Sequence, residues 1–256
     1  MLGEDLIELH EHPRTTAPFS ERYPGLTPEA GYTAARRLHE HRLAAGWKPV
    51  GRKIGFTNRT LWSRYGVFEP MWGMVYDRTV IYASHDVAEV ALTGLVQPRI
   101  EPEICFRLRS APRSSEEQEL LSCIEWMAHS VEIVQCHHPD WKVTIADCTA
   151  DNGLHGRLIV GAPAPLEDPD KLALVQAKLF KGERLVDQGV GANVLGSPLA
   201  SLGHLVELLR NQPQAPPLRA GEIISTGVLT DAHPVAAGET WRTEVDGLQG
   251  LSITFA

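Results

Sequence analysis

The sequence predicts an α+β fold in which a helical N-terminal stretch precedes a β-rich remainder. The first 45 or so residues have helical patterning, whereas short apolar runs rich in β-branched residues dominate from about residue 50 onward. Glycine, proline and aspartate separate these runs, and two further helical segments interrupt them. Because the strands follow the helices rather than alternating with them, the order argues against a βαβ architecture.

Local signals place the elements along the chain. Thr27-Pro28-Glu29 combines an N-cap residue, a first-turn proline and an acid near the positive end of the helix dipole, so a helix is expected from here to about Gly46. A second helix is expected from about residue 114, and a third over about 199–209 with Ser197 as its N-cap. The predicted strands are 74–81, 100–108, 130–135, 158–160, 174–180, 222–226 and 251–255.

Composition and charge exclude several classes of protein. The formal net charge of −8 disfavours non-specific nucleic-acid binding, because the phosphate backbone requires a basic surface. No stretch approaches the length of a membrane span, and the acidic N-terminus lacks the basic-then-apolar pattern of a signal peptide. The cysteines form no C-x-x-C pair and lie in apolar surroundings, which indicates buried free thiols in a reducing compartment. We therefore expect a cytoplasmic globular protein without a nucleic-acid or membrane partner.

The most informative feature is a set of three glutamates in otherwise apolar sequence. Glu101 and Glu103 are two residues apart in a predicted strand, so their side chains point to the same face. Glu132 lies in another β-branched run. An isolated pair of this kind is commonly solvent-exposed. Three carboxylates on neighbouring strands would instead repel one another unless a cation joined them, and oxygen-rich sites suit Mg²⁺, Mn²⁺ or Ca²⁺.

Other segments carry weaker signals when each is taken alone. Lys53 lies between two glycines that permit close approach of a ligand, although a lysine there could equally occupy an exposed turn. Residues 151–153 are typical of a turn, and His155 follows closely. His137 and His138 precede a proline and indicate a loop rather than a metal site. The sequence contains no phosphate-binding loop and no dinucleotide fingerprint.

In order and spacing these segments resemble the 2-keto-4-pentenoate hydratase branch of the fumarylacetoacetate hydrolase (FAH) superfamily, which also contains 4-oxalocrotonate decarboxylases. Residues 51–57, G-R-K-I-G-F-T, resemble the family segment G-Y-K-I-G-L-T, and residues 97–104 resemble its first metal-ligand strand. Residues 131–134 resemble the second such strand, 150–152 the A-D-N turn, and 218–227 the strand R-x-G-D-x-I-x-T-G. The matches are colinear over nearly the whole chain and override the interpretation of these glutamates and the lysine as exposed.

The resemblance implies a fold, a cofactor and a set of site residues. The fold would be a single domain with an FAH-type mixed β-roll, in which residues 1–75 form the helical N-terminal portion and 76–256 the β-rich core. Mg²⁺ or Mn²⁺ would be held by Glu101, Glu103 and Glu132, and a 2-oxo acid substrate would chelate the ion. Lys53 would act beside it as a catalytic residue that binds the carboxylate or transfers protons. The residues assigned to substrate binding are Phe56, Met71, Asp151, Asn152, Leu154 and Thr226. Phe56, Met71 and Leu154 among them would form an apolar pocket for the substrate tail.

The chain departs from the family pattern at two positions. Met71 stands where many hydratases have the acid of P-D-F-G, and Leu154 stands where A-D-N-A-S has its serine. The replaced groups are ones expected to handle protons or orient water. His155 is therefore proposed as a substitute general acid or base, because an unperturbed imidazole has a pKa of about 6.5.

The family resemblance leaves several reactions open. We predict a lyase that hydrates a 2-hydroxypentadienoate-like substrate in aromatic-compound catabolism. One alternative is decarboxylation of a 2-oxo dicarboxylate, with Arg52, Arg78 or Arg157 binding the distal carboxylate. The others are C–C hydrolysis of an acylpyruvate and a non-catalytic partner subunit. We expect a homo-oligomer or a complex with a homologous decarboxylase or hydratase.

Overall fold

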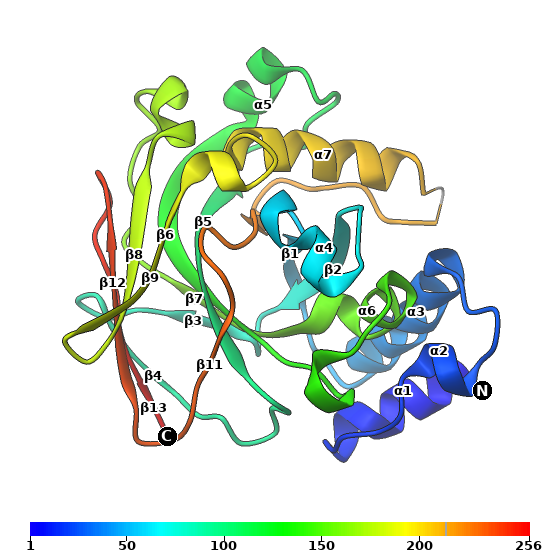
Figure 1. The fold of residues 1–256 in the computed structure, drawn as a ribbon. Helices are drawn as coiled ribbons and strands as arrows, with labels where there is room; N and C mark the ends of the chain where they lie inside the picture. The colour runs from blue at the N-terminus through cyan, green and yellow to red at the C-terminus, as the bar shows by residue number, and fades with distance from the viewer. Residues whose placement is uncertain (213) are drawn as a thin grey trace.

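The computed structural model describes residues 1–212 and 214–256 and combines two sheets with a cluster of N-terminal helices (Figure 1). The α-helices are α1 (Leu2–Glu11), α2 (Phe19–Arg22), α3 (Pro28–Ala44), α4 (Trp62–Tyr65), α5 (Glu117–Cys123), α6 (Ile145–Ala150) and α7 (Pro198–Arg210). The strands are β1 (Pro49–Gly55), β2 (Met71–Tyr76), β3 (Val80–Tyr82), β4 (Val87–Val90), β5 (Arg99–Leu108), β6 (Ile124–Val134), β7 (His155–Val160), β8 (Gln176–Lys181), β9 (Arg184–Val190), β10 (Ile223–Ser225), β11 (His233–Pro234), β12 (Thr240–Val245) and β13 (Ser252–Phe255). Short 3₁₀ turns are η1 (Arg59–Leu61), η2 (Pro139–Trp141), η3 (Asn152–Leu154), η4 (Pro169–Ala173) and η5 (Gly191–Asn193).

The strands form two mixed sheets. The larger one has the order β2-β1-β10-β5-β6-β7-β3, with β11 pairing with β5, and the smaller one has the order β4-β13-β12-β8-β9. Strands β1 and β10 are parallel, whereas β5 and β6 in the middle of the larger sheet are antiparallel. Buried apolar side chains from both sheets share one cluster, which includes Ile100, Val131, Ile133, Ile159, Leu179, Trp241, Ile253 and Phe255. The predicted α+β fold with a mixed β core is confirmed.

The helices cover the sheets at two places. Helices α1 and α3 pack together with α6, and their shared core includes Leu6, Leu38 and Ala150. In Figure 1 these helices lie on the far side of the larger sheet from β12 and β13. Helix α7 buries Leu202 and Leu205 in the same cluster as Ile104 of β5. Helix α6 thus lies between the N-terminal helices and β2, an edge strand of the larger sheet.

Two of the three predicted helix starts agree with the sequence. The Thr27 hydroxyl accepts a hydrogen bond from the backbone N–H of Ala30, and α3 begins at Pro28 as predicted. The Ser197 hydroxyl likewise accepts from the N–H of Ala200 at the start of α7. The helix predicted from about residue 114 begins later, at Glu117.

Several boundaries differ from the prediction, and β6, for example, begins at Ile124 rather than at residue 130. The helical portion ends at Ala44 rather than near residue 75, because β1 and β2 already belong to the larger sheet. Strand β1 was missed because its glycines and adjacent Arg52 and Lys53 give it no apolar alternation. The strand predicted over 74–81 is two strands, β2 and β3, separated by a turn. Helix α6 was not predicted, because it is too short for a periodic signal and depends on a capping box.

Two further sequence-based expectations concern the cysteines and the membrane. All four cysteines are buried and free, as predicted. Among the helices of the described residues, none has both the length and the apolar character needed to cross a bilayer.

Candidate metal and substrate site

The three predicted glutamates come together because of the register between β5 and β6. Glu101 lies directly opposite Glu132 in this antiparallel pair, and Glu103 lies two residues further along β5 on the same face. One carboxylate oxygen from each residue lies within 4.8 Å of the others. Glu103 and Glu132 are fully buried, whereas Glu101 is partly exposed. The sequence prediction of a carboxylate cluster is therefore matched by the geometry.

The hydrogen bonds of these carboxylates leave oxygens available to a further ligand. Glu103 Oε2 accepts from the Ser225 hydroxyl and, at 3.0 Å, from the Gly227 N–H. Glu103 Oε1 is buried and has no hydrogen-bond partner among the described residues. An unsatisfied buried oxygen is costly in a folded protein. Its position among three carboxylates is that of a ligand for a cation.

The electrostatics of the cluster also favour a cation. Burial, reinforced by the charge of Glu132 and only partly offset by Lys53, raises the pKa of Glu101 to about 8. Burial and the two neighbouring carboxylates raise the pKa of Glu103 well above its ordinary value. Burial would also raise the pKa of Glu132, but Lys53 and His155 more than offset it and lower that pKa. Without a cation the protein therefore disfavours the ionised forms of Glu101 and Glu103, and a bound cation would relieve the repulsion between the carboxylates.

Lys53 is the cation of this site. Strand β1 places its Nζ 3.3 Å from Glu132 Oε2, and the side chain is only 3 % exposed. Burial alone would lower the pKa of Lys53, but the charges of Glu132, Glu101 and Glu103 outweigh it and raise that pKa. A Cβ on Gly55 would lie 3.0 Å from Lys53 Nζ, so glycine at that position leaves room for the amine. Lys53 is therefore held as an ammonium group beside the carboxylates.

A cavity of about 50 Å³ adjoins Lys53 and Glu101. It has room for roughly three to five water molecules, which suits a small substrate. Its lining is otherwise largely apolar and comprises Gly55, Phe56, Asn58, Met71, Val134, Trp141, Val143, Gly153, Leu154, Gly227, Val228 and Ala232. We call this the inner cavity. A wider cleft of about 850 Å³, which we call the outer cleft, shares Trp141, Val143 and Ala232 with it.

Three of the six residues assigned to substrate binding line the inner cavity: Phe56, Met71 and Leu154. The other three do not line it and bond to the protein instead. The Asn152 side chain accepts from the Met74 N–H at 2.9 Å and donates to the Met74 carbonyl at 3.0 Å.

Asp151 and Thr226 are likewise engaged within the protein. Asp151 bonds two histidines, and the Thr226 hydroxyl donates to the Ile104 carbonyl at 2.7 Å. Ser225, the neighbour of Thr226, is the residue that reaches the carboxylate cluster. Strand alternation could have indicated this, because Ser225 is the register partner of Lys53.

His155 also differs from its predicted role. Its Nδ1 lies 2.8 Å from Glu132 Oε1 and its Nε2 lies 2.8 Å from Thr79 Oγ1. Both ring nitrogens are thus occupied by the protein, and the side chain is buried outside the lining of the inner cavity. Burial lowers the pKa of His155 despite its carboxylate partner. This geometry suits a group that orients Glu132 rather than one that exchanges protons with a substrate.

The arginines considered for a distal carboxylate lie elsewhere. Arg52 is buried and pairs with Glu222 at 2.7 Å, while Arg78 donates to the Ala45 carbonyl and Arg157 to the Gly156 carbonyl. None of the three lines either the inner cavity or the outer cleft.

Comparison with known proteins gives a consistent set of relatives. The chain is 31% identical over 260 residues to a 2-hydroxyhexa-2,4-dienoate hydratase of Comamonas testosteroni, covering 99% of this chain and 96% of that protein. It is 34% identical over 221 residues to a 4-oxalocrotonate decarboxylase of a Pseudomonas species, covering 86% of this chain and 83% of that protein. No family model matches the chain.

Solved structures show the same relationship. The structure of 4-oxalocrotonate decarboxylase from Pseudomonas putida G7, complexed with magnesium and adipate, superposes with a TM-score of 0.92 at 27% identity, covering 100% of this chain and 96% of that one. A fumarylacetoacetate hydrolase family protein from Yersinia pestis shares the fold alone, with a TM-score of 0.61 at 12% identity over 81% of this chain and 94% of that one.

Proposed function

Since the chain belongs to the hydratase and decarboxylase branch of the fumarylacetoacetate hydrolase superfamily, and is thus a lyase, we propose that it binds Mg²⁺ or Mn²⁺ and hydrates an unsaturated 2-oxo acid with an uncharged tail. The observation that carries the proposal is the juxtaposition of three carboxylates, a buried lysine and an apolar cavity.

The three glutamates fit a hard divalent cation. They offer oxygen ligands only, they are gathered within a few ångströms, and Glu103 Oε1 lacks a partner within the described chain. Ser225 and Gly227 fix the other oxygen of Glu103, and His155 fixes Glu132. When bound, the ion would act as a Lewis acid toward the carboxylate and keto oxygens of a 2-oxo acid.

Lys53 supplies the positive charge and the proton within the inner cavity. Hydration places a hydroxyl group on one carbon of the double bond and a proton on the other. An ammonium group beside the substrate stabilises the enolate more than the ketone and can deliver that proton. Among the described residues, the titratable side chains that line the cavity are Lys53 and Glu101, and Glu101 is assigned to the metal.

His155 acts in this proposal as a positioning residue rather than the general acid or base expected from the sequence. Its hydrogen bond to Glu132 Oε1 fixes the plane of that carboxylate, while Lys53 approaches Glu132 Oε2. Histidine at this position therefore affects the metal site rather than the substrate directly.

The walls of the inner cavity favour a substrate tail without charge. Phe56, Met71 and Leu154 surround the space beyond Lys53, and no arginine lines it within the described residues. A carboxylate buried there would be desolvated without a partner, which is strongly unfavourable. A dienoate such as 2-hydroxypenta-2,4-dienoate matches this surface better than a dicarboxylate.

Decarboxylation of a 2-oxo dicarboxylate is the second candidate, and Arg99 favours it. Arg99 precedes Glu101 by two residues on β5, so it lies on the same face, and it lines the outer cleft. Its guanidinium stacks over the Trp141 ring at 4.3 Å. A distal carboxylate that reached the outer cleft would meet this cation.

One purified sample assayed against three substrates separates the reactions. With Mg²⁺ or Mn²⁺ present, we expect turnover of 2-hydroxypenta-2,4-dienoate that exceeds turnover of 2-oxohex-3-enedioate and acetopyruvate. Preferred release of CO₂ from the dicarboxylate would replace hydration by decarboxylation, and preferred cleavage of acetopyruvate would indicate C–C hydrolysis. Inactivity on all three would support a non-catalytic partner subunit.

The family resemblance also supports an oligomer. We propose a homo-oligomer, or a complex with a homologous decarboxylase or hydratase, and light scattering after size exclusion tests the first. A cytoplasmic location stays a prediction from the sequence.

A further inference from the structure

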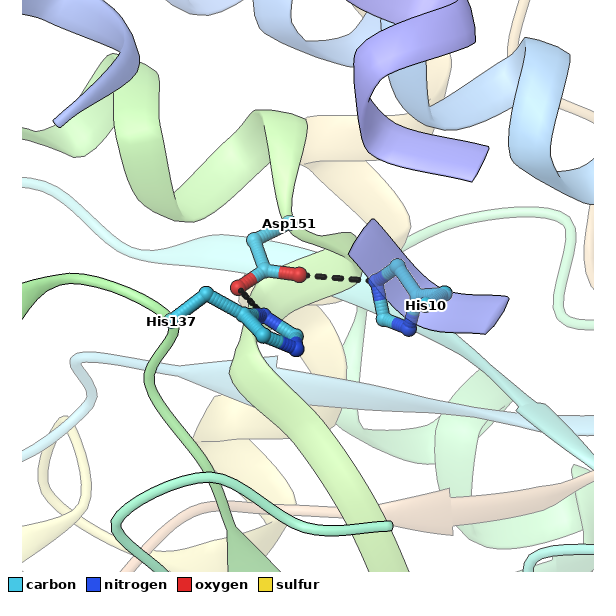
Figure 2. A group of neighbouring side chains, drawn as sticks. All are labelled: His10, His137 and Asp151. Carbon is cyan, nitrogen blue, oxygen red and sulfur yellow. Dashed lines mark hydrogen bonds and ion pairs between the residues drawn. The ribbon is translucent and has the colours of Figure 1, made fainter. Parts of the chain in front are cut away.

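Asp151 is the centre of a cluster of side chains that includes His10 of the N-terminal helix α1 and His137 (Figure 2). Its Oδ1 lies 2.8 Å from His10 Nε2, and its Oδ2 lies 2.7 Å from His137 Nδ1. His10 comes from α1, His137 from the loop after β6, and Asp151 follows the last residue of α6. The N-terminal helix α1 therefore meets the segment around α6 at one carboxylate, 141 residues away in the sequence.

The protonation of this cluster follows from a fourth residue. Arg42 Nη2, from α3, lies 3.1 Å from His10 Nδ1. Arginine can only donate, so His10 Nδ1 must accept, and the ring proton of neutral His10 is on Nε2, which donates to Asp151. Burial lowers the pKa of His10 to about 4 even though Asp151 opposes the shift, so the ring is neutral at neutral pH.

The same proton argues against a metal ion in this cluster. Two imidazoles and a carboxylate are a plausible donor set for zinc or iron. Ligation through His10 Nε2 would, however, require loss of the remaining ring proton while Arg42 still donates to Nδ1. Metal-bound histidines instead donate their second nitrogen to an acceptor. The arrangement is a hydrogen-bonded chain that runs from Arg42 through His10 to Asp151, with His137 on the other side.

This chain ends at an unusual piece of backbone. The residues after Asp151 have positive φ in succession, with 48° at Asn152, 66° at Gly153 and 61° at Leu154. The left-handed conformation is unfavourable for leucine and must be imposed by its surroundings. Asn152 is fixed by its two hydrogen bonds to Met74, and the Leu154 carbonyl accepts from the Gln135 N–H at 2.9 Å. Asp151 fixes the point where α6 ends and this turn begins.

The turn forms one wall of the inner cavity. Gly153 and Leu154 both line it, and a Cβ on Gly153 would lie 3.2 Å from Lys53 Cδ and from Met71 Sδ. A shift of the turn would therefore press on Lys53 or open the cavity. Misplacement of a catalytic group by about 1 Å can cost about 100-fold in rate.

We propose that Arg42, His10 and His137 are positioning residues for the reaction, which hold Asp151 and through it the left-handed turn that packs against Lys53. This inference rests on the proposed function only for its kinetic readout. It also assigns a role to α1 and α3, whose residues are absent from the lining of the inner cavity.

The test compares His10→Ala with His10→Gln in the full-length protein. A glutamine can donate its amide N–H to Asp151 and accept from Arg42 through its carbonyl, whereas alanine can do neither. His12→Ala is the matched control, because His12 is the exposed C-cap residue of the same helix. Thermal melts first identify a temperature at which all four proteins are folded.

Hydrogen exchange of the segment 152–154 is the first measurement and needs no substrate. In His10→Ala these amides should exchange at least about 10-fold faster, because lowering the free energy of local opening by about 1.4 kcal/mol raises the exchange rate about tenfold. In His10→Gln and His12→Ala they should exchange at the wild-type rate. Kinetics on 2-hydroxypenta-2,4-dienoate with Mg²⁺ is the second measurement. We expect His10→Ala to lower kcat by about 10- to 100-fold with little change in KM, and His10→Gln to restore it.

The outcomes separate this inference from the proposed function. The inference would be overturned if His10→Ala had the same exchange rates and the same kcat as the wild type. It would also be overturned if His10→Ala and His10→Gln lost kcat equally. If the wild type does not turn over the dienoate, the proposed function fails, and hydrogen exchange alone supports or overturns the positioning role.

Discussion

Leu154 should set the length of the substrate tail that the inner cavity accepts. Its side chain is 4% exposed and packs with Met71 and Cys148 at the apolar end of the cavity. Leu154→Ala removes three carbons from this wall, next to a space of only about 50 Å³. The enlarged cavity should accommodate one more methyl group on the substrate.

The size of the effect follows from the buried area. Burial of one further CH₂-sized group is worth about 0.8 kcal/mol, which is roughly 4-fold in kcat/KM. Measured discrimination of one methylene by an apolar pocket reaches about 10- to 200-fold. The ratio of kcat/KM for 2-hydroxyhexa-2,4-dienoate to that for 2-hydroxypenta-2,4-dienoate should therefore rise by at least about 4-fold. The substitution should also cost about 2–5 kcal/mol of stability, because it leaves a cavity in a buried site.

The assay compares both dienoates with the same preparation. Any loss of folded enzyme cancels in the ratio, so stability and specificity are measured separately. Leu154→Met is the control, because it nearly conserves volume and should leave the ratio close to that of the wild type. An unchanged ratio in a folded Leu154→Ala enzyme would show that Leu154 does not contact the substrate tail.

Three further predictions concern the metal, Lys53 and His10. Removal of divalent ions with EDTA should lower the melting temperature, and Mg²⁺ at 100 times its Kd should raise the free energy of unfolding by about 2.7 kcal/mol. An equal increase on adding Mg²⁺ to Glu103→Gln would exclude this glutamate as a ligand. Lys53→Met should lower kcat by about 10²- to 10⁴-fold if the amine transfers a proton, whereas an increase in KM alone would indicate a binding role. His10 faces Asp151, Arg42 and His137, and its pKa is lowered from 6.5 to about 4 in the folded protein. As the pH falls below 6.5, His10 in the unfolded chain therefore takes up a proton before His10 in the folded chain does. The folded state consequently loses stability between about pH 6.5 and pH 4. This loss should amount to about 2–3 kcal/mol by pH 4.5 in chemical unfolding experiments, and His10→Gln should lack it; identical pH profiles for the two proteins would contradict the assignment of a neutral, buried His10.

The carboxylate cluster could be predicted from the sequence because strand alternation and one strand pairing bring its residues together. Glu101 and Glu103 share a face through strand alternation alone, and Glu132 follows from the register of one antiparallel pair. Phe56, Met71 and Leu154 line the inner cavity, and their contact with a substrate stays a prediction. Each of these assignments depends on the position of the residue in a motif and on a side-chain orientation that is set by the local backbone.

The assignments that differ depend on partners far away in the chain. Asp151 was expected to face the substrate, but His10, 141 residues away, turns it toward the N-terminal helices. Asn152 is turned toward Met74, 78 residues away. His155 is satisfied by Glu132 and Thr79 together. Nothing in the local sequence distinguishes a polar side chain that faces a ligand from one that bonds to a distant segment.

The two departures from the family pattern fall on the same wall of the site. Met71 and Leu154 both line the inner cavity and belong to one apolar cluster, and Lys53 and Glu101 are retained in the lining of the same cavity. Apolar residues at these two positions cannot donate, accept or orient a proton. Because Glu101 is assigned to the metal, Lys53 is then the side chain in the described cavity that remains to exchange protons with the substrate. The exact placement of Lys53 consequently matters more here than in a site with a second acid or base. A change in the turn that packs against Lys53, which Asp151 positions, should therefore affect the reaction directly.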